Sequence, residues 1–274
     1  MSRVASTDTG VARLEALLGT FDRLAIAASG GVDSTTLGVL AHRLLGRRAL
    51  LVHAVSPAVP ASATERLRAL AASEGFALRL LDARELADPR YRANPLDRCY
   101  FCKLNLYDAV RRVWDGPIAS GTNLDDLGDF RPGLRAAGEA GVRHPFVEAG
   151  LGKEAVRALA RTLGLGPIAD LPASPCLASR LETGIPVSPE RLALVAEVER
   201  LLEERLGPGD QRCRIRADRI ELELPERRLE ALDPDSRAAL LTAAAALVSA
   251  HGVELPLRLA PYRRGSAFLG RRAG

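Results

Sequence analysis

The stretch Ala28-Ser29-Gly30-Gly31-Val32-Asp33-Ser34 lies between two segments of different periodicity. Residues 24–28 are uniformly apolar, as in a buried strand, whereas residues 33–45 carry apolar side chains at helical spacing. The stretch is therefore predicted to be a strand-to-helix turn. Its two adjacent glycines let a ligand approach the backbone closely, and the N-terminus of the following helix favours an anion.

The residue types in this turn suit a polyphosphate with Mg²⁺, because two serine hydroxyls and one carboxylate accompany the glycines. No lysine follows the glycines, so the turn is not a Walker A loop. The alternative is an ordinary glycine-rich turn of a doubly wound fold.

Strand and helix patterns alternate around the turn, which predicts an α/β fold with a doubly wound parallel sheet. Ligands of such sheets bind beyond the carboxyl ends of the strands, where Ser29 to Ser34 fall. The other expected elements are strands at 49–55, 76–82 and 117–120, a helix at 61–74 ending at Gly75, a loop at 88–95, a short strand at 145–147 and a helix at 152–163.

A second, smaller α+β domain is expected after this sheet. We place the boundary near residue 180, which gives a nucleotide domain at 1–180 and a substrate or oligomerisation domain at 181–274. The expected elements of the second domain are a helix at 189–206, strands at 212–217 and 219–224, a helix at 236–250 and a strand at 253–259.

Composition is that of an ordinary globular protein, with 47% hydrophobic and 26% charged residues among 274. The sequence shows neither an apolar run of membrane-spanning length nor the apolar core of a signal peptide, so we expect a cytoplasmic protein with no membrane partner. The net charge of +4 and pI of 9.1 permit nucleic-acid binding without requiring it, and we do not expect a nucleic acid as partner.

Only two of the 38 basic residues are lysines, Lys103 and Lys153. Arginine in place of lysine is most simply a coding bias. Because lysine is a compact, mobile charge and arginine a rigid fork, a phosphate site can require lysine. Chance survival of the two lysines is the alternative.

Three cysteines lie at positions that suggest a role in metal binding, redox or sulfur chemistry. Cys99 and Cys102 form a C-x-x-C pair at a predicted helix start, a location that favours thiolate. In a cytoplasmic chain this spacing indicates a metal, a cluster or a redox pair before a structural disulfide, although two core thiols would also satisfy it. Cys176 lies in a proline-flanked loop, whereas Cys213 is expected to be packed inside a strand.

A second polar turn, residues 121–129, follows the strand at 117–120 and is expected at the same edge of the sheet. In the functional interpretation Gly121 and Asn123 line the nucleotide site, and Asp125, Asp126 or Asp129 helps to place Mg²⁺. In the alternative it is a surface turn rich in Asn and Asp.

The pattern Ser29-Gly30-Gly31-Val32-Asp33-Ser34 resembles the pyrophosphate loop of the N-type ATP pyrophosphatases, in which AMP is transferred to a carboxylate or carbonyl oxygen. Together with other motifs in order along the chain it resembles the LarE family, the sulfur transferases of nickel-pincer nucleotide biosynthesis. The other motifs are Arg98-Cys99-Tyr100-Phe101-Cys102-Lys103, Gly121-Thr122-Asn123, Pro175 to Arg180, the Arg212-Cys213-Arg214 strand and Arg264-Gly265-Ser266.

The resemblance implies a reaction. ATP adenylates the carboxylates of pyridinium-3,5-biscarboxylic acid mononucleotide, and sulfur replaces AMP to give the bisthiocarboxylic product. Cys176 matches the sulfur-bearing catalytic residue. In one branch of the family this cysteine gives up its own sulfur and the C-x-x-C pair is missing. The presence of Cys99 and Cys102 resembles the other branch, which holds a [4Fe-4S] cluster on three cysteines, here Cys99, Cys102 and Cys176.

The resemblance also implies ligand contacts. Asp33 would ligate Mg²⁺. Arg180, Arg212 and Arg214 would hold the substrate phosphate, with Glu199 nearby, although the arginines of this strand can also form a solvated face. Independently of the resemblance, Lys103 is a candidate phosphate contact, because it is one of the two lysines retained in an arginine-rich chain. The ATP contacts would come from Ser29, Gly30, Gly31, Asp33, Ser34, Gly121 and Asn123.

The implied partners are the small-molecule nucleotide substrate, a sulfide donor, further copies of the chain in a homo-oligomer, and other nickel-pincer biosynthesis proteins that receive the product. Three other functions compete. A tRNA thiolase shares the loop and three cysteines, but the chain has few aromatic residues and no zinc-ribbon cysteines. An ammonia-using synthetase needs no C-x-x-C, and a nucleotide-binding regulator would release no pyrophosphate.

Overall fold

The computed structural model describes residues 2–128, 131–172 and 175–268. The chain divides into two compact units. Unit 1 comprises Met1–Glu85 with Cys99–Ser174, and unit 2 comprises Leu86–Arg98 with Pro175–Gly274. No pattern in the sequence indicates that Leu86–Arg98, which precedes the C-x-x-C pair, is part of the second unit.

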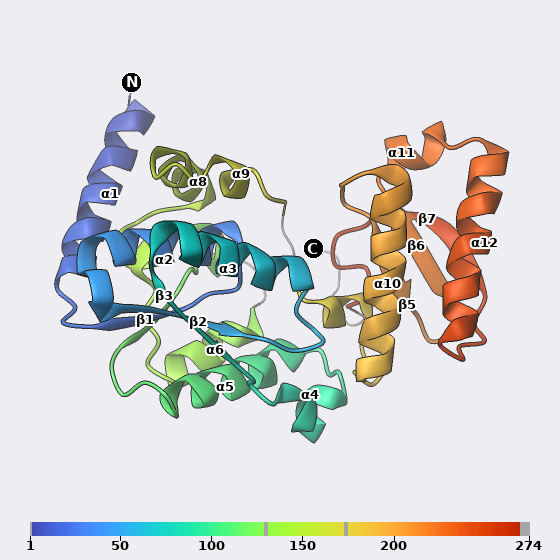
Figure 1. Ribbon diagram of the computed structural model, residues 1–274, viewed down its shortest axis with the longest axis horizontal. Coiled ribbons are helices and arrows are strands. Elements are labelled where there is room, and N and C mark those ends of the chain that lie inside the picture. Colours follow the sequence, from blue (N-terminus) through green and yellow to red (C-terminus); the bar gives the residue numbers. More distant parts are fainter. Residues whose placement is uncertain (1, 129–130, 173–174, 269–274) are drawn as a thin grey trace. The chain divides into compact units, whose positions relative to one another are not determined.

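Unit 1 is built on a parallel sheet of four strands in the order β3-β2-β1-β4, which confirms the predicted fold class (Figure 1). Its strands are β1 (Leu24–Ala27), β2 (Ala49–Ala54), β3 (Ala77–Leu81) and β4 (Ile118–Ser120). Its helices are α1 (Ser2–Gly19), α2 (Val32–Leu45), α3 (Ala61–Glu74), α5 (Arg98–Arg111), α6 (Pro132–Glu139), α7 (Pro145–Glu148), α8 (Lys153–Thr162) and α9 (Gly166–Ala169), with short 3₁₀ turns at Gly46–Arg48 and Leu124–Gly128.

The strand order places a topological switch point between β1 and β4. The chain runs outward from β1 through β2 to β3 and then returns to pair β4 with the other side of β1. In open α/β sheets ligands bind beyond the carboxyl ends of the strands at such a point. Ser29–Ser34 follows β1 and Gly121–Asn123 follows β4, so both turns lie there.

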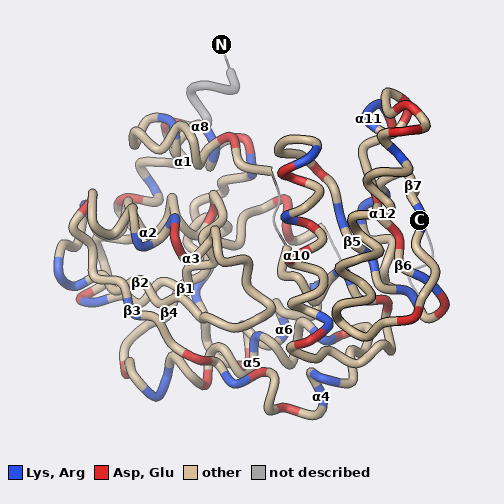
Figure 2. The backbone as a smooth tube through the Cα atoms, turned by 45° about the vertical axis from the view of Figure 1, so that its right-hand side comes forward, with Lys and Arg blue, Asp and Glu red and all other residues tan. Residues whose placement is uncertain are grey.

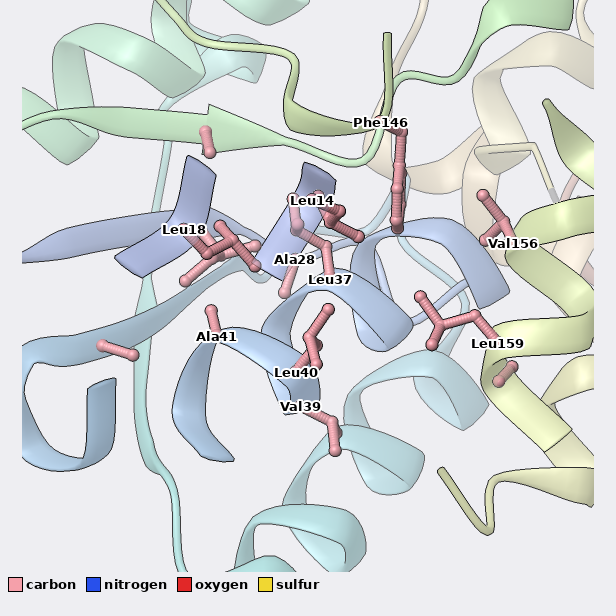
Figure 3. Packing of buried hydrophobic residues seen from close by; sticks show 14 of the residues in the cluster. Leu14, Leu18, Ala28, Leu37, Val39, Leu40, Ala41, Phe146, Val156 and Leu159 are labelled. Atoms are coloured by element: carbon pink, nitrogen blue, oxygen red, sulfur yellow. The ribbon is translucent and has the colours of Figure 1, made fainter. Parts of the chain in front are cut away.

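Alternate residues of β1 face two different cores because side chains alternate along a strand. Leu24 and Ile26 join a large cluster with α1, α2 and α8, and Figure 3 shows its side chains meeting around Leu37 and Leu40. Ala25 and Ala27 face a second cluster with α5 and α6. Helices therefore cover both faces of the sheet.

Two local predictions in the connecting segments were wrong. Residues 145–147 form the short helix α7 instead of a strand, because Pro145 suits the first helical position and Glu148 accepts the backbone N–H of His144 at 3.1 Å. Residues 88–95 contain the short helix α4 (Pro89–Arg92), whose N-cap Asp88 accepts from the Arg90 N–H.

Unit 2 holds a three-stranded sheet in the order β5-β6-β7. β5 (Arg212–Ile215) and β6 (Ile220–Leu224) are antiparallel, whereas β6 and β7 (Leu257–Pro261) are parallel. Figure 2 marks acidic and basic residues along this sheet. The helices of the unit are α4, α10 (Pro189–Leu206), α11 (Glu226–Ala231) and α12 (Pro234–Ala250), with 3₁₀ turns at Leu177–Arg180 and, at the unit boundary, Glu85–Ala87.

Helices that cross a membrane are long and predominantly apolar. Within the described ranges, none combines the length and the apolar character needed to cross a bilayer.

Candidate functional site

The turn after β1 is closed by its own two serines. Ser34 Oγ accepts the backbone N–H of Ser29 at 2.9 Å and lies 3.1 Å from Ser29 Oγ. Gly31 is the N-cap of α2 and has extended backbone angles. These contacts fix the turn at the N-terminus of a 14-residue helix, a place where backbone N–H groups and the helix dipole favour an anion.

Gly30 is required by conformation and by space. Its φ of +78° lies in the left-handed region, and a Cβ on it would be 2.8 Å from the carbonyl oxygen of Ala63 in α3. Arg66, also in α3, donates to the Gly30 carbonyl at 2.7 Å. Burial lowers the pKa of Arg66. The loop is thus fastened to α3 on one side.

The turn after β4 touches the loop on the other side. A Cβ on Gly121 would be 2.5 Å from the Ser34 nitrogen and 2.7 Å from the Asp33 carbonyl carbon, so only glycine fits. Asn123 Nδ2 donates to Asp33 Oδ1 at 3.2 Å. The structure therefore brings together Asp33, Ser34, Gly121 and Asn123, which the sequence had assigned to one nucleotide site.

Lys153, the first residue of α8, also reaches this loop. Its Nζ lies 2.5 Å from Asp33 Oδ2. Its backbone N–H donates to the carboxylate of Asp125, which therefore lies at the N-terminus of α8. Asp126 pairs with Arg131 at 2.6 Å, and Asp129 lies outside the described residues.

A buried histidine of β2, His53, contacts the backbone at the end of β1, where the loop begins. His53 Nδ1 lies 2.8 Å from the carbonyl oxygen of Ala28, and its Nε2 lies 2.9 Å from the Thr64 hydroxyl. Burial lowers the pKa of His53, and the positive charge of Arg68 lowers it further against the effect of the Ala28 hydrogen bond. A neutral ring that donates to Ala28 and accepts from Thr64 satisfies both contacts.

The donor set fits Mg²⁺ in the way nucleotide enzymes use it. Mg²⁺ takes one or two carboxylates and completes its shell with phosphate oxygens and water. Asp33 supplies a carboxylate that is 25% exposed at the helix N-terminus, where the phosphates would bind.

The C-x-x-C pair lies in the first turns of α5 in unit 1. Cys99 and Cys102 are both half-buried and three residues apart, hence on one face of the helix. Lys103 follows them, with its Nζ 5.9 Å from the Tyr107 ring centroid. Across the described parts of the chain, no three His, Cys, Asp or Glu side chains gather as a metal site would need. A [4Fe-4S] cluster on Cys99, Cys102 and Cys176 stays a prediction.

Cys176 belongs to unit 2 and is the N-cap of the 3₁₀ turn Leu177–Arg180. The thiol residue is half-buried, and its backbone carbonyl accepts from Ser179 N–H at 2.9 Å. Arg180 Nη1 donates to the Pro175 carbonyl at 2.8 Å, and Arg214 Nη1 donates to the Ser179 carbonyl at 2.8 Å. Two of the arginines expected to bind a phosphate thus brace the backbone that carries Cys176.

These arginines are also paired with carboxylates. Arg180 binds Glu199 through two hydrogen bonds of 2.8 and 3.0 Å. Arg214 binds Glu223 at 3.0 Å, and both side chains are buried. Arg212, 9% exposed at its side chain, pairs with Asp210 at 3.1 Å. Their role in binding a phosphate stays a prediction.

The rest of β5 and β6 extends this charged network. Burial alone would raise the pKa of Glu221, but hydrogen bonds from Arg258, Arg216 and Arg219 outweigh it and lower the pKa to about 2. Arg216 also lies 3.3 Å from Glu223. Cys213, on the opposite face of β5, is fully buried as predicted, and burial raises its pKa far above the usual range.

The sequence did not assign three residues of the loop region. Lys153 was noticed only as one of two lysines, and its contact with Asp33 joins residues 120 positions apart. Arg66 and His53 carried no sequence signal, because a single arginine on a helix and a single histidine in a strand are common in any core or surface.

A parallel sheet whose switch point carries this glycine- and serine-rich loop defines a nucleotide-binding α/β protein of the pyrophosphate-loop type. No model of a known protein family matches the chain. The chain is 39% identical over 221 residues to an uncharacterised protein of Synechocystis, covering 79% of this chain and 82% of that one.

Two further relatives carry functional names. Over 231 residues the chain is 32% identical to the pyridinium-3,5-bisthiocarboxylic acid mononucleotide synthase of Lactiplantibacillus plantarum, covering 82% of this chain and 83% of that one. It is 28% identical over 208 residues to one component of the glutamine-hydrolysing GMP synthase of Methanopyrus kandleri, covering 68% and 64%. The chain belongs to the family of the first of these two enzymes, the LarE family, which confirms the family prediction.

Proposed function

We propose that the protein is an ATP-dependent sulfur transferase that converts pyridinium-3,5-biscarboxylic acid mononucleotide to the bisthiocarboxylic acid mononucleotide. The observation that carries the proposal is the loop Ser29–Ser34, set between Ala63 and Gly121 at the switch point of the sheet. It occurs in a chain 32% identical to a synthase named for that product.

The first step is adenylation. A substrate carboxylate oxygen attacks the α-phosphorus of ATP, the bond to the bridging oxygen of the β-phosphate breaks, and pyrophosphate leaves. The backbone N–H groups of the loop and the N-terminus of α2 bind the leaving pyrophosphate. Asp33 would hold Mg²⁺, which would neutralise phosphate charge, and Asn123 fixes the orientation of Asp33 through Oδ1.

In the second step a sulfur nucleophile forms a C–S bond at the acyl carbon, and AMP leaves. If the nucleophile is the Cys176 thiolate, loss of the Cys176 α-proton and cleavage of its Cβ–Sγ bond release the thiocarboxylate and leave dehydroalanine. If hydrosulfide from a donor attacks, the thiocarboxylate forms directly and Cys176 is retained. A repeat on the second carboxylate completes the product.

We further propose Cys99, Cys102 and Cys176 as ligands of a [4Fe-4S] cluster, since thiolates are the usual ligands of such clusters. What supports it is the placement of Cys99 and Cys102 on one face of α5. Anaerobic reconstitution should give about four irons per chain. Full iron content in Cys99→Ser or Cys176→Ser would exclude this ligand set.

Substrate selection is proposed to lie in unit 2, where Arg180, Arg212 and Arg214 would bind the mononucleotide phosphate near Glu199. Arg212 offers the clearest test, because its partner Asp210 is half-exposed and tolerates the loss better than a buried carboxylate. Arg212→Ala should raise KM for the mononucleotide and leave KM for ATP unchanged. Equal rises in both would argue against a substrate-specific role. Lys103 is proposed as a further phosphate contact.

The deciding experiment mixes the protein with ATP, Mg²⁺, sulfide and either the pyridinium mononucleotide or bulk tRNA. Release of pyrophosphate and a thiocarboxylate found by mass spectrometry support the proposal, and a thiolated base supports a tRNA thiolase. ATP binding without pyrophosphate release would indicate a regulator. The mass of the protein after one turnover shows whether Cys176 has lost H₂S. Size-exclusion chromatography with light scattering tests the proposed homo-oligomer.

A further inference from the structure

Both carboxylate oxygens of Asp33 are already engaged. Oδ2 receives the Lys153 ammonium at 2.5 Å, and Oδ1 accepts from the Asn123 amide at 3.2 Å. A divalent cation bound through Asp33 needs one of these oxygens. The neutral amide of Asn123 can remain, but the ammonium of Lys153 and a dication would repel each other at this distance.

Lys153 is placed so that its side chain can move while its backbone stays fixed. Its N–H donates to the Asp125 carboxylate, which anchors the first residue of α8. Beyond the Cα, four rotatable bonds carry an ammonium whose side chain is 37% exposed. The ammonium can therefore leave Asp33 without disturbing α8.

Lysine suits such an exchange better than arginine. A guanidinium binds a carboxylate through two parallel hydrogen bonds and releases it less readily, whereas an ammonium binds as a point charge. In a chain with 36 arginines, this position retains one of only two lysines.

We propose that Lys153 is an exchangeable counter-cation. In the nucleotide-free protein it neutralises Asp33 and occupies the place of the metal. When Mg²⁺ arrives with the polyphosphate, the metal takes Asp33 Oδ2 and the ammonium transfers to phosphate oxygens. The inference deepens the proposed function, on which it rests for the identity of its ligand as a polyphosphate.

The first arm of the test uses Mn²⁺ alone, followed by electron paramagnetic resonance, with no nucleotide present. Lys153→Met should bind Mn²⁺ roughly five- to tenfold more tightly than the wild type, because the competing cation is gone. The matched control is Arg161→Met, which removes one positive charge from the exposed side of the same helix. It should leave Mn²⁺ binding unchanged, and Asp33→Asn added to Lys153→Met should abolish the gain.

The second arm uses inorganic pyrophosphate with Mg²⁺ in isothermal titration calorimetry. Lys153→Met should weaken pyrophosphate binding by roughly five- to tenfold, since the transferred ammonium is missing. Lys153→Arg keeps the charge but should also bind pyrophosphate more weakly than the wild type, because the guanidinium holds Asp33.

Failure of either arm overturns the proposal. If Lys153→Met binds Mn²⁺ no more tightly than the wild type, Lys153 does not compete with the metal. If it binds pyrophosphate normally, the ammonium does not transfer. Circular dichroism verifies folding, and Lys153→Gln replaces the variant if it is unfolded. The Mn²⁺ arm needs neither substrate nor turnover, so it can succeed even if the sulfur-transfer function is wrong.

Discussion

Gly121 lies against the backbone of Ser34, at the point where the carboxyl end of β4 meets the first turn of α2. A Cβ added to Gly121 would be 2.5 Å from the Ser34 nitrogen. The contact joins two turns that are far apart in sequence into one wall of the candidate nucleotide site. It also gives Gly121 a purely steric reason to be glycine.

We therefore expect Gly121→Ala to displace the loop. The backbone at Ser34 must shift to accept the new methyl group, which should cost about 1–3 kcal/mol of unfolding free energy. ATP affinity should fall on the order of tenfold or more, because phosphate contacts depend on loop geometry. The control is Gly128→Ala in the following 3₁₀ turn, where the described chain has no heavy atom within 4 Å of the added Cβ. Equal ATP affinity in both variants would contradict this role for Gly121.

Alanine substitutions at the two glycines of the loop should separate an effect on stability from an effect on ATP binding. Gly31 has φ of −84°, and a Cβ on it would meet only Ser29 Oγ at 3.5 Å, an ordinary contact, within the described residues. Gly31→Ala should therefore keep its stability to within about 0.5 kcal/mol. A marked loss of ATP binding in this stable variant would show that a ligand approaches Gly31. Unchanged binding would place the phosphates elsewhere.

Gly30→Ala should instead destabilise the protein. It forces alanine to a positive φ, at about 1–2 kcal/mol, and adds a clash with Ala63. Gly75→Ala isolates the first effect, because Gly75 has φ of +77° and no described heavy atom lies within 4 Å of its Cβ position. Urea unfolding should show a larger loss of unfolding free energy for Gly30→Ala than for Gly75→Ala. Equal losses would mean that α3 yields to the methyl group.

Structural features of this protein could be predicted from sequence where they are caused by residues a few positions away. Features that depend on contacts made only in the folded protein could not. The helix Ala61–Glu74 and its end at Gly75 were predicted to the residue, because capping and periodicity act within a few positions. The segment Pro145–Glu148 was misassigned because Pro-Phe-Val is compatible with a strand, while its helix depends on a capping carboxylate. Lys153 and Asp33 meet only after the sheet has formed, so no local pattern could pair them.

The charged network of unit 2 illustrates the same limit. Alternation along the strand predicted at 212–217 places Arg212, Arg214 and Arg216 on one face, but it cannot tell a solvated face from a buried one. The register of β5 against β6 sets Glu221 and Glu223 opposite them. Arg214 and Arg216 are buried because carboxylates of β6 neutralise them, whereas Arg212 pairs with Asp210, which lies just before β5.

Removal of the Glu223 carboxylate should therefore lower the free energy of unfolding strongly. Glu223→Ala leaves Arg214 and Arg216 buried without their shared carboxylate, which should cost about 3–5 kcal/mol. Glu204→Ala removes an exposed carboxylate from its pair with Arg200 and should change the unfolding free energy by about 0.5 kcal/mol or less. Chemical denaturation of both variants is the measurement. Similar small losses would show that water reaches the arginines.

His53 should make stability depend on pH. Its folded-state pKa lies below the unfolded value, so the unfolded chain takes up a proton first as the pH falls below about 6.5. The free energy of unfolding should therefore decrease by up to about 1 kcal/mol from pH 6.5 to 5.5 through this group. Burial lowers the pKa of His144 also, which acts in the same direction.

His53→Gln tests this dependence, because an amide can both donate to Ala28 and accept from Thr64. Urea unfolding at pH 7.5 and 5.5 should show a smaller difference for the variant than for the wild type. His144→Gln in the same series separates the second histidine. An unchanged pH dependence in His53→Gln would mean that His53 is not the group responsible.

The four thiols should differ in reactivity in a way that isolates the candidate sulfur site. Cys213 is fully buried in β5, and burial raises its pKa, so it is both inaccessible and protonated in the folded protein. Cys176 is half-buried in its turn. N-ethylmaleimide followed by peptide mass spectrometry should therefore modify Cys176 in native buffer and Cys213 only after unfolding in urea. Cys213→Ala, as the control, should leave native labelling of Cys176 and sulfur transfer unchanged. Labelling of Cys213 in the native protein at the rate of Cys176 would show that β5 opens. Solvent access would then no longer distinguish the two thiols, and a sulfur lost in turnover could not be assigned to Cys176 on that ground.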